Sequence, residues 1–412
     1  MTSTTVPRET GAARDPLGPS LAWALSRILP GREETWLLRS VLHRGPAAHE
    51  AWRAFASSVG DLPSLFRTDT GGRKRLSPLL LASVRENELP ADPGLLTILR
   101  TAWLREELRL EAFRGIARGA LDALRAARVP FFLLKGTALA ETVYPTACLR
   151  HAHDIDVLVP ERELGRARNA LVEGGTMTPR RTLPEGRGFE LRHPSDTPVL
   201  LLTRLFRHPF YRSDLGALRA RAREVEAGPL GRVPALSPAD DLLHALGHAS
   251  YCPSRSTLLW VTDAWMILRS SDAVDWDAFA GAVSESRLEL PVWVMLRYLA
   301  EKIDAPVPGE ALEHAARLAA DAGKLRRDVA LYGARSRRGR HPRLRALERP
   351  GWVDRLSLWR WQLFPSRPYV DWAYGNPAPA VVPFIYLLRP LTFATERLKW
   401  RILGWIRSWT GR

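Results

Sequence analysis

The chain has 412 residues, which is enough to bury a substantial core and to form two or three lobes. Its hydrophobic content of 46 % and charged content of 25 % are ordinary for a soluble protein. No apolar run reaches the roughly 18 residues that a membrane-spanning helix needs. These values argue against an integral membrane protein and against a largely disordered chain.

The formal net charge of +16 admits two interpretations. A basic surface attracts polyanions such as nucleotides, nucleic acid or anionic lipid. Arginine far outnumbers lysine, however, and most arginines are scattered, which is typical of a GC-rich genome. Two cysteines, Cys148 and Cys252, form neither a disulfide framework nor a metal-binding pattern. The N-terminus lacks the apolar segment of a signal peptide, so we expect a cytoplasmic protein.

The first part of the chain is predicted to be helical. Residues 1–18 are polar with proline and glycine, and we expect them to be disordered. Residues 19–128 show apolar positions at helical spacing and predict an N-terminal helical lobe. It ends in a long helix from about Leu95 to Ala127, with at most one break, whose apolar stripe includes Leu104, Leu108 and Phe113.

Residues 131–159 contain the chemically informative pattern. Phe131–Leu134 is a continuous apolar run that predicts a buried strand, and Lys135, Gly136 and Thr137 come directly after it. A glycine where a strand turns into a helix lets a phosphate approach the backbone closely, and a helix N-terminus favours anions. An ordinary strand-to-helix turn could have the same residues. The segment therefore indicates phosphate binding only in combination with an acidic strand downstream of it.

That second strand carries Asp154 and Asp156, separated by one apolar residue. Side chains alternate along a strand, so the two carboxylates share one face. Their mutual repulsion and desolvation would be relieved by a cation, and an all-oxygen site suits Mg²⁺. The alternative is a pair neutralised by arginines. Arg150, in the preceding loop, could neutralise the pair or contact a phosphate, as could Lys135.

This ordered set resembles the nucleotidyltransferase superfamily of the polymerase-β type. The superfamily pattern is a glycine turn and then, after ten to twenty residues, an Asp-hydrophobic-Asp strand. The fuller string from Leu134 through Tyr144-Pro145 to Val159 looks more specifically like the bacterial family labelled "uncharacterised nucleotidyltransferase", over about residues 75–315.

The resemblance implies a fold and a set of site residues. The fold is α+β: a small mixed-sheet nucleotidyltransferase core, residues 129–210, between the N-terminal helical lobe and a C-terminal helical lobe, residues 211–330. Asp154 and Asp156 would hold Mg²⁺ and act in catalysis. The triphosphate of ATP or another nucleotide would be bound by four neighbouring residues: Lys135, Gly136, Thr137 and Arg150.

The chain departs from the superfamily at the third carboxylate, which the resemblance places on a later strand beside the first two. Residues 189–193 and 199–206 predict a hairpin, and Leu200 stands at the position of that carboxylate. Leucine can neither ligate a metal nor accept a proton. Glu190, on the preceding strand, is the candidate substitute, and Asp196 in the turn is a poorer one.

Three further polar residues lie in the predicted C-terminal lobe. His244 and His248 are four residues apart on one helix face, and Asp263 is on the next helix. They could recognise the acceptor or a base, or they could form a buried His–Asp hydrogen bond that joins the two helices. His151 and His153 fit no zinc pattern and are expected to be solvated loop residues.

The last segment, residues 331–412, is basic and rich in tryptophan. Residues 391–409 form an amphipathic pattern with aromatic residues on one face and basic residues off it. This pattern suits docking onto the protein's own body or peripheral contact with an anionic membrane, such as the inner membrane surface.

The resemblance therefore implies transfer of a nucleoside monophosphate, most simply AMP from ATP, with Mg²⁺, to a hydroxyl or phosphate of an acceptor. The acceptor itself is open: a small molecule, a peptide, a protein or an RNA end. A nucleotide-binding protein that has lost catalysis is the first alternative, because of Leu200. A membrane-surface or nucleic-acid-associated protein acting through the basic tail is the second. The oligomeric state is not indicated.

Overall fold

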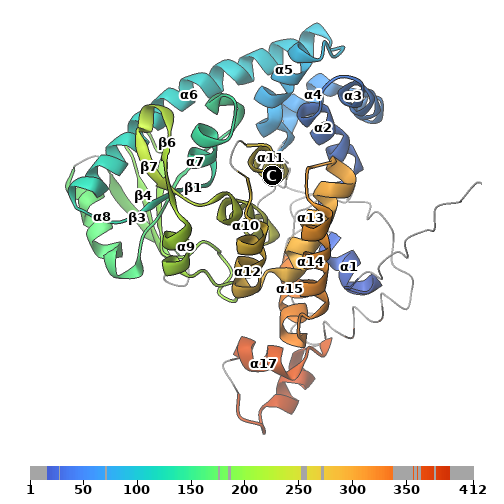
Figure 1. Cartoon of the computed structure of the whole chain (residues 1–412), viewed down its shortest axis with the longest axis vertical. Coiled ribbons are helices and arrows are strands. Elements are labelled where there is room, and N and C mark those ends of the chain that lie inside the picture. The colour runs from blue at the N-terminus through green and yellow to red at the C-terminus, as the bar shows by residue number, and fades with distance from the viewer. Residues whose placement is uncertain are drawn as a thin grey trace, which may run out of the picture.

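The computed structural model describes residues 16–389, except 27, 70–71, 175–176, 184–186, 252–257, 271–272, 337–355, 357–359, 361–362 and 375–376. A five-stranded sheet lies on one side of the molecule and two groups of helices on the other (Figure 1). One 34-residue helix, α6 (Pro93–Ala126), connects the N-terminal helices to the sheet. The predicted α+β class is confirmed.

Two helices of the N-terminal lobe, α4 and α6, begin at side-chain caps. Asp61 and Asp92 accept hydrogen bonds from backbone N–H groups in the first turns of α4 and α6, and a proline lies in the first turn of each helix. The elements before α6 are α1 (Pro19–Ser26), α2 (Arg32–Leu42), α3 (Pro46–Val59), α4 (Leu62–Thr68), η1 (Arg73–Leu76) and α5 (Ser77–Glu86).

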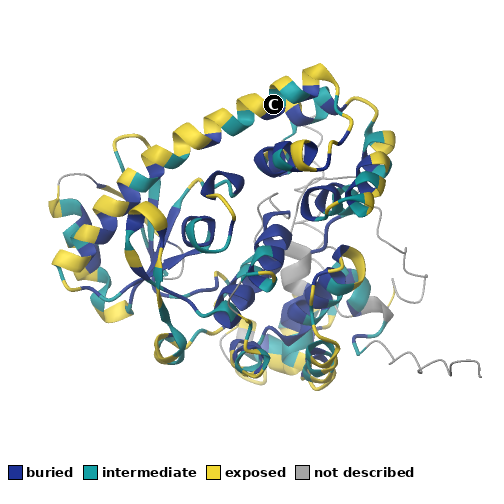
Figure 2. Ribbon diagram, turned by 45° about the horizontal axis from the view of Figure 1, so that its top comes forward, coloured by how far each residue is buried: buried dark blue, intermediate teal, exposed yellow. Residues whose placement is uncertain are grey.

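Helix α6 is unbroken and serves two separate cores. Leu95 and Leu99 near its start pack into the core of the helical lobes, whereas Phe113 and the apolar residues after it pack against the sheet. Between these two stretches the predicted apolar stripe was wrong, because Leu104 and Leu108 do not pack into a core and are 57 % and 69 % exposed. The middle of the helix bridges the two cores and has solvent on most sides (Figure 2).

The sheet is mixed, as predicted. Its strand order is β1-β2-β5-β4-β3, with β2 and β5 parallel and the other neighbours antiparallel. Strand β3 was not predicted, because its five residues are exposed and show no apolar alternation. The strands are β1 (Phe132–Leu134), β2 (Ile155–Leu158), β3 (Thr178–Thr182), β4 (Gly188–Arg192) and β5 (Pro198–Leu202).

The two faces of the sheet belong to different cores. Ile155 and Val157 lie in the core under α6 and α8 (Leu164–Glu173). The alternate residues of β2 point the other way, and Leu158 joins the larger core that contains the C-terminal helices. Asp156 therefore projects from the sheet face that the C-terminal lobe covers.

The C-terminal lobe includes a hairpin that was not predicted. Strands β6 (Arg223–Glu226) and β7 (Arg232–Ala235) form a separate two-stranded sheet where only helices were expected. The helices are α9 (Leu215–Arg221), α10 (Pro238–Ser250), α11 (Leu259–Leu268), α12 (Trp276–Ser286), α13 (Glu289–Ile303), α14 (Gly309–Ala320), α15 (Lys324–Ser336) and α17 (Arg367–Tyr374).

Helix α10 is held closely against the chain that leaves β5. Its start is the predicted one, since Ser237 accepts a hydrogen bond from the backbone N–H of Asp240 and Pro238 comes after the cap. A Cβ atom on Gly247 would lie 2.4 Å from the ring of Phe206. A glycine is therefore required here for the helix to approach the core.

The basic run 335–349 and the amphipathic segment 391–409 fall almost wholly outside the described residues. Within the described part of the chain, no helix combines the length and the hydrophobicity that crossing a bilayer requires.

Candidate nucleotide site

A cavity of about 250 Å³ lies where β1, β2 and β5 face α10 and α11. It brings together residues from the turn after β1, the loop before β2, β5 and both helices. Eleven polar residues line it: Arg75, Lys135, Arg150, His153, Asp154, Arg187, Arg207, Asp241, His244, His248 and Asp263. Leu200 and Trp260 contribute apolar surface.

The register of β1 and β2 brings Lys135 to Asp156. Leu134, the last residue of β1, pairs with Asp156, so the next residue lies beside the acidic strand. Lys135 has φ of +51°, a left-handed conformation that costs a non-glycine residue about 1–2 kcal/mol. Its Nζ atom lies 3.1 Å from Oδ2 of Asp156. Strained residues of this kind cluster at functional sites.

Asp156 is almost completely buried, with 1 % of its side chain exposed. Its Oδ2 atom contacts Lys135, but Oδ1 has no hydrogen-bond partner in the described part of the chain. Burial raises the pKa of the Asp156 carboxyl to about 6, although Lys135 favours the charged form. A buried carboxylate oxygen without a partner is costly, and a bound cation would satisfy it.

Asp154 is more open than Asp156, with 28 % of its side chain exposed, and it lines the cavity. Its backbone carbonyl accepts a hydrogen bond from the Thr137 hydroxyl at 3.4 Å, which connects the start of α7 (Lys135–Thr142) to the acidic strand. The two aspartates thus differ in environment: one is accessible from the cavity and the other is buried beside Lys135.

The residues present fit a divalent cation of the magnesium type. Mg²⁺ is usually held by one or two carboxylates together with water and substrate phosphates, and it does not need a complete protein cage. Asp154 and the unpartnered oxygen of Asp156 provide such a partial set. Among the described residues, no cluster of three or more His, Cys, Asp or Glu side chains is arranged to hold a metal ion.

The turn after β1 is more tightly packed than the sequence suggested. A Cβ atom on Gly136 would lie 3.2 Å from Nη1 of Arg150 and 3.3 Å from the Cβ of Ala152. Gly136 lines the cavity, whereas the Thr137 side chain is 8 % exposed and does not. The glycine thus admits the Arg150 side chain, and any phosphate contact of Thr137 would come from its backbone N–H.

Arg150 forms a buried ion pair with the C-terminal lobe. Its Nε and Nη2 atoms donate to the two carboxylate oxygens of Asp263 at 2.6 and 2.8 Å. The Tyr144 hydroxyl donates to the same carboxylate at 2.8 Å. The predicted His–Asp hydrogen bond was wrong, because Asp263 pairs with Arg150 and Tyr144. The Arg150–Asp263 pair therefore fixes α11 against the loop before the acidic strand.

Glu190 is not brought to the cavity. It lies opposite Leu200, which in turn lies opposite Asp156, so two strand spacings, about 10 Å, separate the backbones of Glu190 and Asp156. Glu190 accepts hydrogen bonds from Arg181 at 2.6 Å and from Arg192 at 3.0 Å. The predicted substitution for the third carboxylate has no support in this arrangement, and Leu200 occupies the cavity wall beside Asp156.

His151 is also not the solvated residue that was expected. Its Nδ1 atom lies 2.8 Å from a carboxylate oxygen of Glu106 on α6, and its side chain is 17 % exposed. This contact could not be predicted from the sequence, because His151 and Glu106 are 45 residues apart and come together only in the folded protein. The loop before β2 is thus anchored on both sides, to α6 through His151 and to α11 through Arg150.

Asp241 lines the cavity and was missed at the level of sequence. It lies in the first turn of α10 and is 6 % exposed. Burial raises the pKa of its carboxyl to about 8, with Asp240 and Asp263 adding to the rise and Arg223 opposing it. An acidic residue near a helix start is usually a stabilising charge at the helix N-terminus, so no local signal indicated a cavity position.

We expect Asp241 to make the stability of the protein depend on pH. The pKa of its carboxyl is about 8 in the folded state against 3.8 as its ordinary value, so the folded protein keeps a proton that the unfolded chain releases. The free energy of unfolding should fall as the pH rises from about 4 to about 8. Urea unfolding across this range checks it: Asp241→Asn should flatten the dependence, and an unchanged slope would contradict the assignment.

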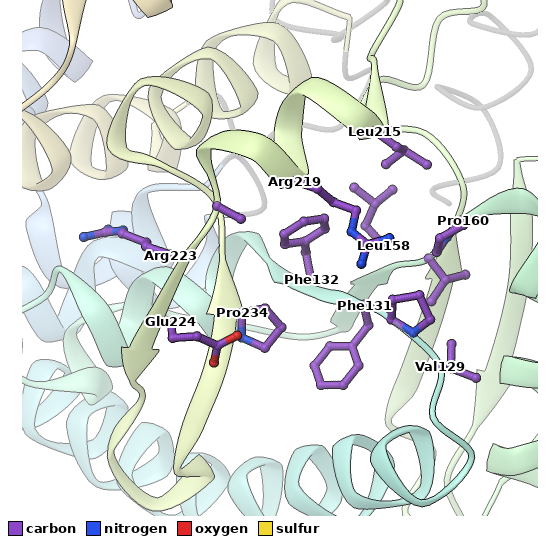
Figure 3. Close-up of a pocket in the computed structure, with 13 residues that line it drawn as sticks. Val129, Phe131, Phe132, Leu158, Pro160, Leu215, Arg219, Arg223, Glu224 and Pro234 are labelled. Carbon is purple, nitrogen blue, oxygen red and sulfur yellow. The ribbon is translucent and has the colours of Figure 1, made fainter.

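A second cavity, of about 440 Å³, lies at the opposite end of β1 and β2 (Figure 3). Its walls include Phe131, Phe132 and Leu158 at the ends of β1 and β2, together with Arg219 of α9 and Glu224 of β6. It contains neither of the aspartates nor the turn after β1, so it is separate from the candidate site.

These features define a class of protein: an α+β protein with an acidic strand beside a strand–turn–helix unit and a cavity lined by charged residues. The model of the protein family described as "uncharacterised nucleotidyltransferase" matches residues 68–303, more than half of the chain. The chain belongs to this family. The match runs from the end of α4 through the sheet to the last residue of α13 and so includes every cavity residue named above.

One solved structure with similarity to this chain is that of the antibiotic-resistance factor ANT(2'')-Ia. The sequences are 16 % identical, and the similarity covers 55 % of this chain and 93 % of that chain with a TM-score of 0.24. A likeness at this level carries no argument about site or substrate. No curated protein matches the chain.

Proposed function

We propose that the protein transfers a nucleoside monophosphate, AMP from ATP, to an acceptor molecule with Mg²⁺ as cofactor, and that the cavity between the sheet and α10–α11 is its active site. The observation that carries the proposal is the buried Asp156, whose Oδ1 has no partner in the described structure, beside Asp154 and Lys135. Membership of a nucleotidyltransferase family supports the reaction class.

Each residue of the site would have a distinct role. Asp154 and Asp156 would hold the metal, which neutralises phosphate charge and stabilises the attacking and leaving oxygens when bound. Lys135 and the backbone N–H groups at the start of α7 would bind the triphosphate. Arg150 would hold the loop before the acidic strand in place, since its guanidinium is already paired with Asp263.

The transfer itself is a substitution at phosphorus. An acceptor oxygen forms a bond to the α-phosphorus, and the bond from that phosphorus to the oxygen bridging to the β-phosphate breaks. Pyrophosphate leaves with the electron pair, and the proton of the acceptor group is lost. Holding both reactants in line contributes much of the rate in reactions of this type.

A second candidate function is nucleotide binding without turnover. It is favoured by one observation, the apolar side chain of Leu200 in the cavity wall directly opposite Asp156. A protein of this kind would bind Mg·ATP through the same residues and would release no pyrophosphate.

Incubation with [α-³²P]ATP and Mg²⁺ in a cell extract separates the two functions. We expect label to appear on an extract component together with pyrophosphate, in an amount that increases with protein and disappears with EDTA. Extract fractionated into small molecules, peptides, proteins and RNA then identifies the acceptor class. Binding of Mg·ATP by calorimetry without label transfer would reject the enzyme and leave the binding function.

The cytoplasmic location and peripheral contact with an anionic membrane remain predictions. The amphipathic segment 391–409 on which membrane contact depends lies outside the described residues. Flotation of the full chain and of a chain ending at residue 389 with anionic vesicles compares the two directly.

A further inference from the structure

Asp241 carries a carboxyl group that reaches the cavity of the candidate site without a partner. The residue lines the cavity and is 6 % exposed. Within the described part of the chain, no hydrogen bond or ion pair engages its side chain. Oδ1 of Asp156 is a sealed oxygen without a partner, and neither oxygen of Asp241 is sealed in this way. A ligand in the cavity can therefore contact this carboxyl and satisfy it.

The cavity wall around Asp241 is largely apolar. Asp241, Ala245 and Ala249 are spaced four residues apart along α10, and all three line the cavity. The two alanines are small and leave space next to the carboxyl. Apolar side chains from two other helices also line the cavity: Leu139 of α7, and Leu259 and Trp260 of α11. Apolar walls with a few polar groups that fix orientation are typical of sites for flat organic ligands.

Burial without a counter-ion keeps the Asp241 carboxyl protonated. An ionised carboxylate in this position would be costly, so the group takes up a proton instead. Its pKa of about 8 agrees, with burial as the largest cause, Asp240 and Asp263 adding to the rise and Arg223 opposing it. A protonated carboxyl presents an O–H donor beside a carbonyl acceptor, just as an amide side chain presents an N–H donor beside its carbonyl.

Asp241 does not complete the acidic pair of β2. Among the described residues, no three His, Cys, Asp or Glu side chains are grouped to hold a metal ion. A ligand part other than the metal-bound phosphates must therefore meet this carboxyl. The edge of adenine has an N6–H donor beside a ring-nitrogen acceptor, and it pairs with amide side chains through two hydrogen bonds. A protonated carboxyl has the same donor–acceptor pair.

We propose that Asp241 binds the amino edge of adenine in the bound nucleotide: its O–H donates to a ring nitrogen, and its carbonyl oxygen accepts from the N6 amino group. This role rests on the proposed nucleotide site and deepens it by naming the base that the site selects. The base would lie against the apolar wall, and the triphosphate would extend to Lys135 and the start of α7.

The test measures binding to the full chain by calorimetry at pH 7, so it does not depend on transfer. The two ligands are Mg·ATP and the Mg²⁺ complex of purine riboside triphosphate, which differs from ATP only in lacking the amino group. We expect the wild type to bind Mg·ATP about 10-fold more tightly. Asp241→Leu removes both hydrogen-bonding atoms and should bind the two nucleotides equally. Asp241→Asn restores a donor beside an acceptor and should keep most of the preference.

Asp277→Leu is the matched control, because Asp277 also lies in the first turn of a helix, α12, but is exposed and does not line the cavity. Thermal unfolding should show that the variants are folded, and Asp241→Ala replaces the leucine variant if that one is not. Equal binding of the two nucleotides by the wild type, or an unchanged preference in a folded leucine or alanine variant, would overturn the role of Asp241 and leave the nucleotide site intact.

The proposed function fails in a different way. Wild-type protein that does not bind Mg·ATP would overturn the nucleotide site and the role of Asp241 with it. Wild-type protein that prefers Mg·ATP through Asp241 and transfers no label from [α-³²P]ATP would support the role of Asp241 and reject only the transfer reaction.

Discussion

Replacing Asp156 with asparagine should lower nucleotidyl transfer by about 100-fold or more, because the amide cannot supply the charge that a metal ion and Lys135 require. Asparagine has nearly the same volume, so packing in the 1 %-exposed position should be kept. The substitution also removes the charge from the unpartnered Oδ1 atom, which is the strongest indication of a cation site in this protein.

Label transfer from [α-³²P]ATP measures the rate, and Mn²⁺ binding monitored by electron paramagnetic resonance measures the site directly. We expect Asp156→Asn to weaken Mn²⁺ binding in the presence of a non-hydrolysable ATP analogue. Asp196→Asn is the control, since Asp196 lies in the exposed turn between β4 and β5 and its side chain is 89 % exposed. Undiminished Mn²⁺ binding in Asp156→Asn would show that the metal, if bound, uses other residues.

Replacing Asp263 with alanine should destabilise the protein by about 3–5 kcal/mol, because it leaves a buried guanidinium without its counter-ion. Arg150 and Asp263 have side chains only 10 % and 7 % exposed, and the pair is bidentate. The Tyr144 hydroxyl loses the same acceptor. We expect the site to suffer as well, since this pair joins α11 to the loop that leads into the acidic strand.

Urea unfolding of Asp263→Ala, Arg150→Ala and the double variant gives the coupling between the two residues. We expect the double variant to lose much less than the sum of the single variants, since removing both partners leaves no unpaired charge. Asp122→Ala breaks an exposed pair with Arg125 and should cost less than about 1 kcal/mol. Additive losses would mean that the two residues stabilise the protein independently.

Much of the site could be predicted from local sequence. The apolar strand before Lys135 and the alternation around Asp156 depend on neighbouring residues only, and the structure has both strands where they were expected. The position of Leu200 opposite Asp156 could be inferred by matching two strands through their patterns. Glu190 was misjudged because strand spacing and its pairing with Arg181 and Arg192 are not visible in a linear pattern.

The sequence by itself determined the class of fold, the acidic pair and the turn, because each depends on the spacing of a few adjacent residues. Only the tertiary structure decided how those residues are used. It paired Lys135 with Asp156 through strand register, paired Arg150 with Asp263 across 113 residues, and brought Asp241 and His244 of α10 to the cavity. Long-range contacts, burial and the protonation states that burial imposes arise only when distant segments pack together, and these decide the chemistry of the site.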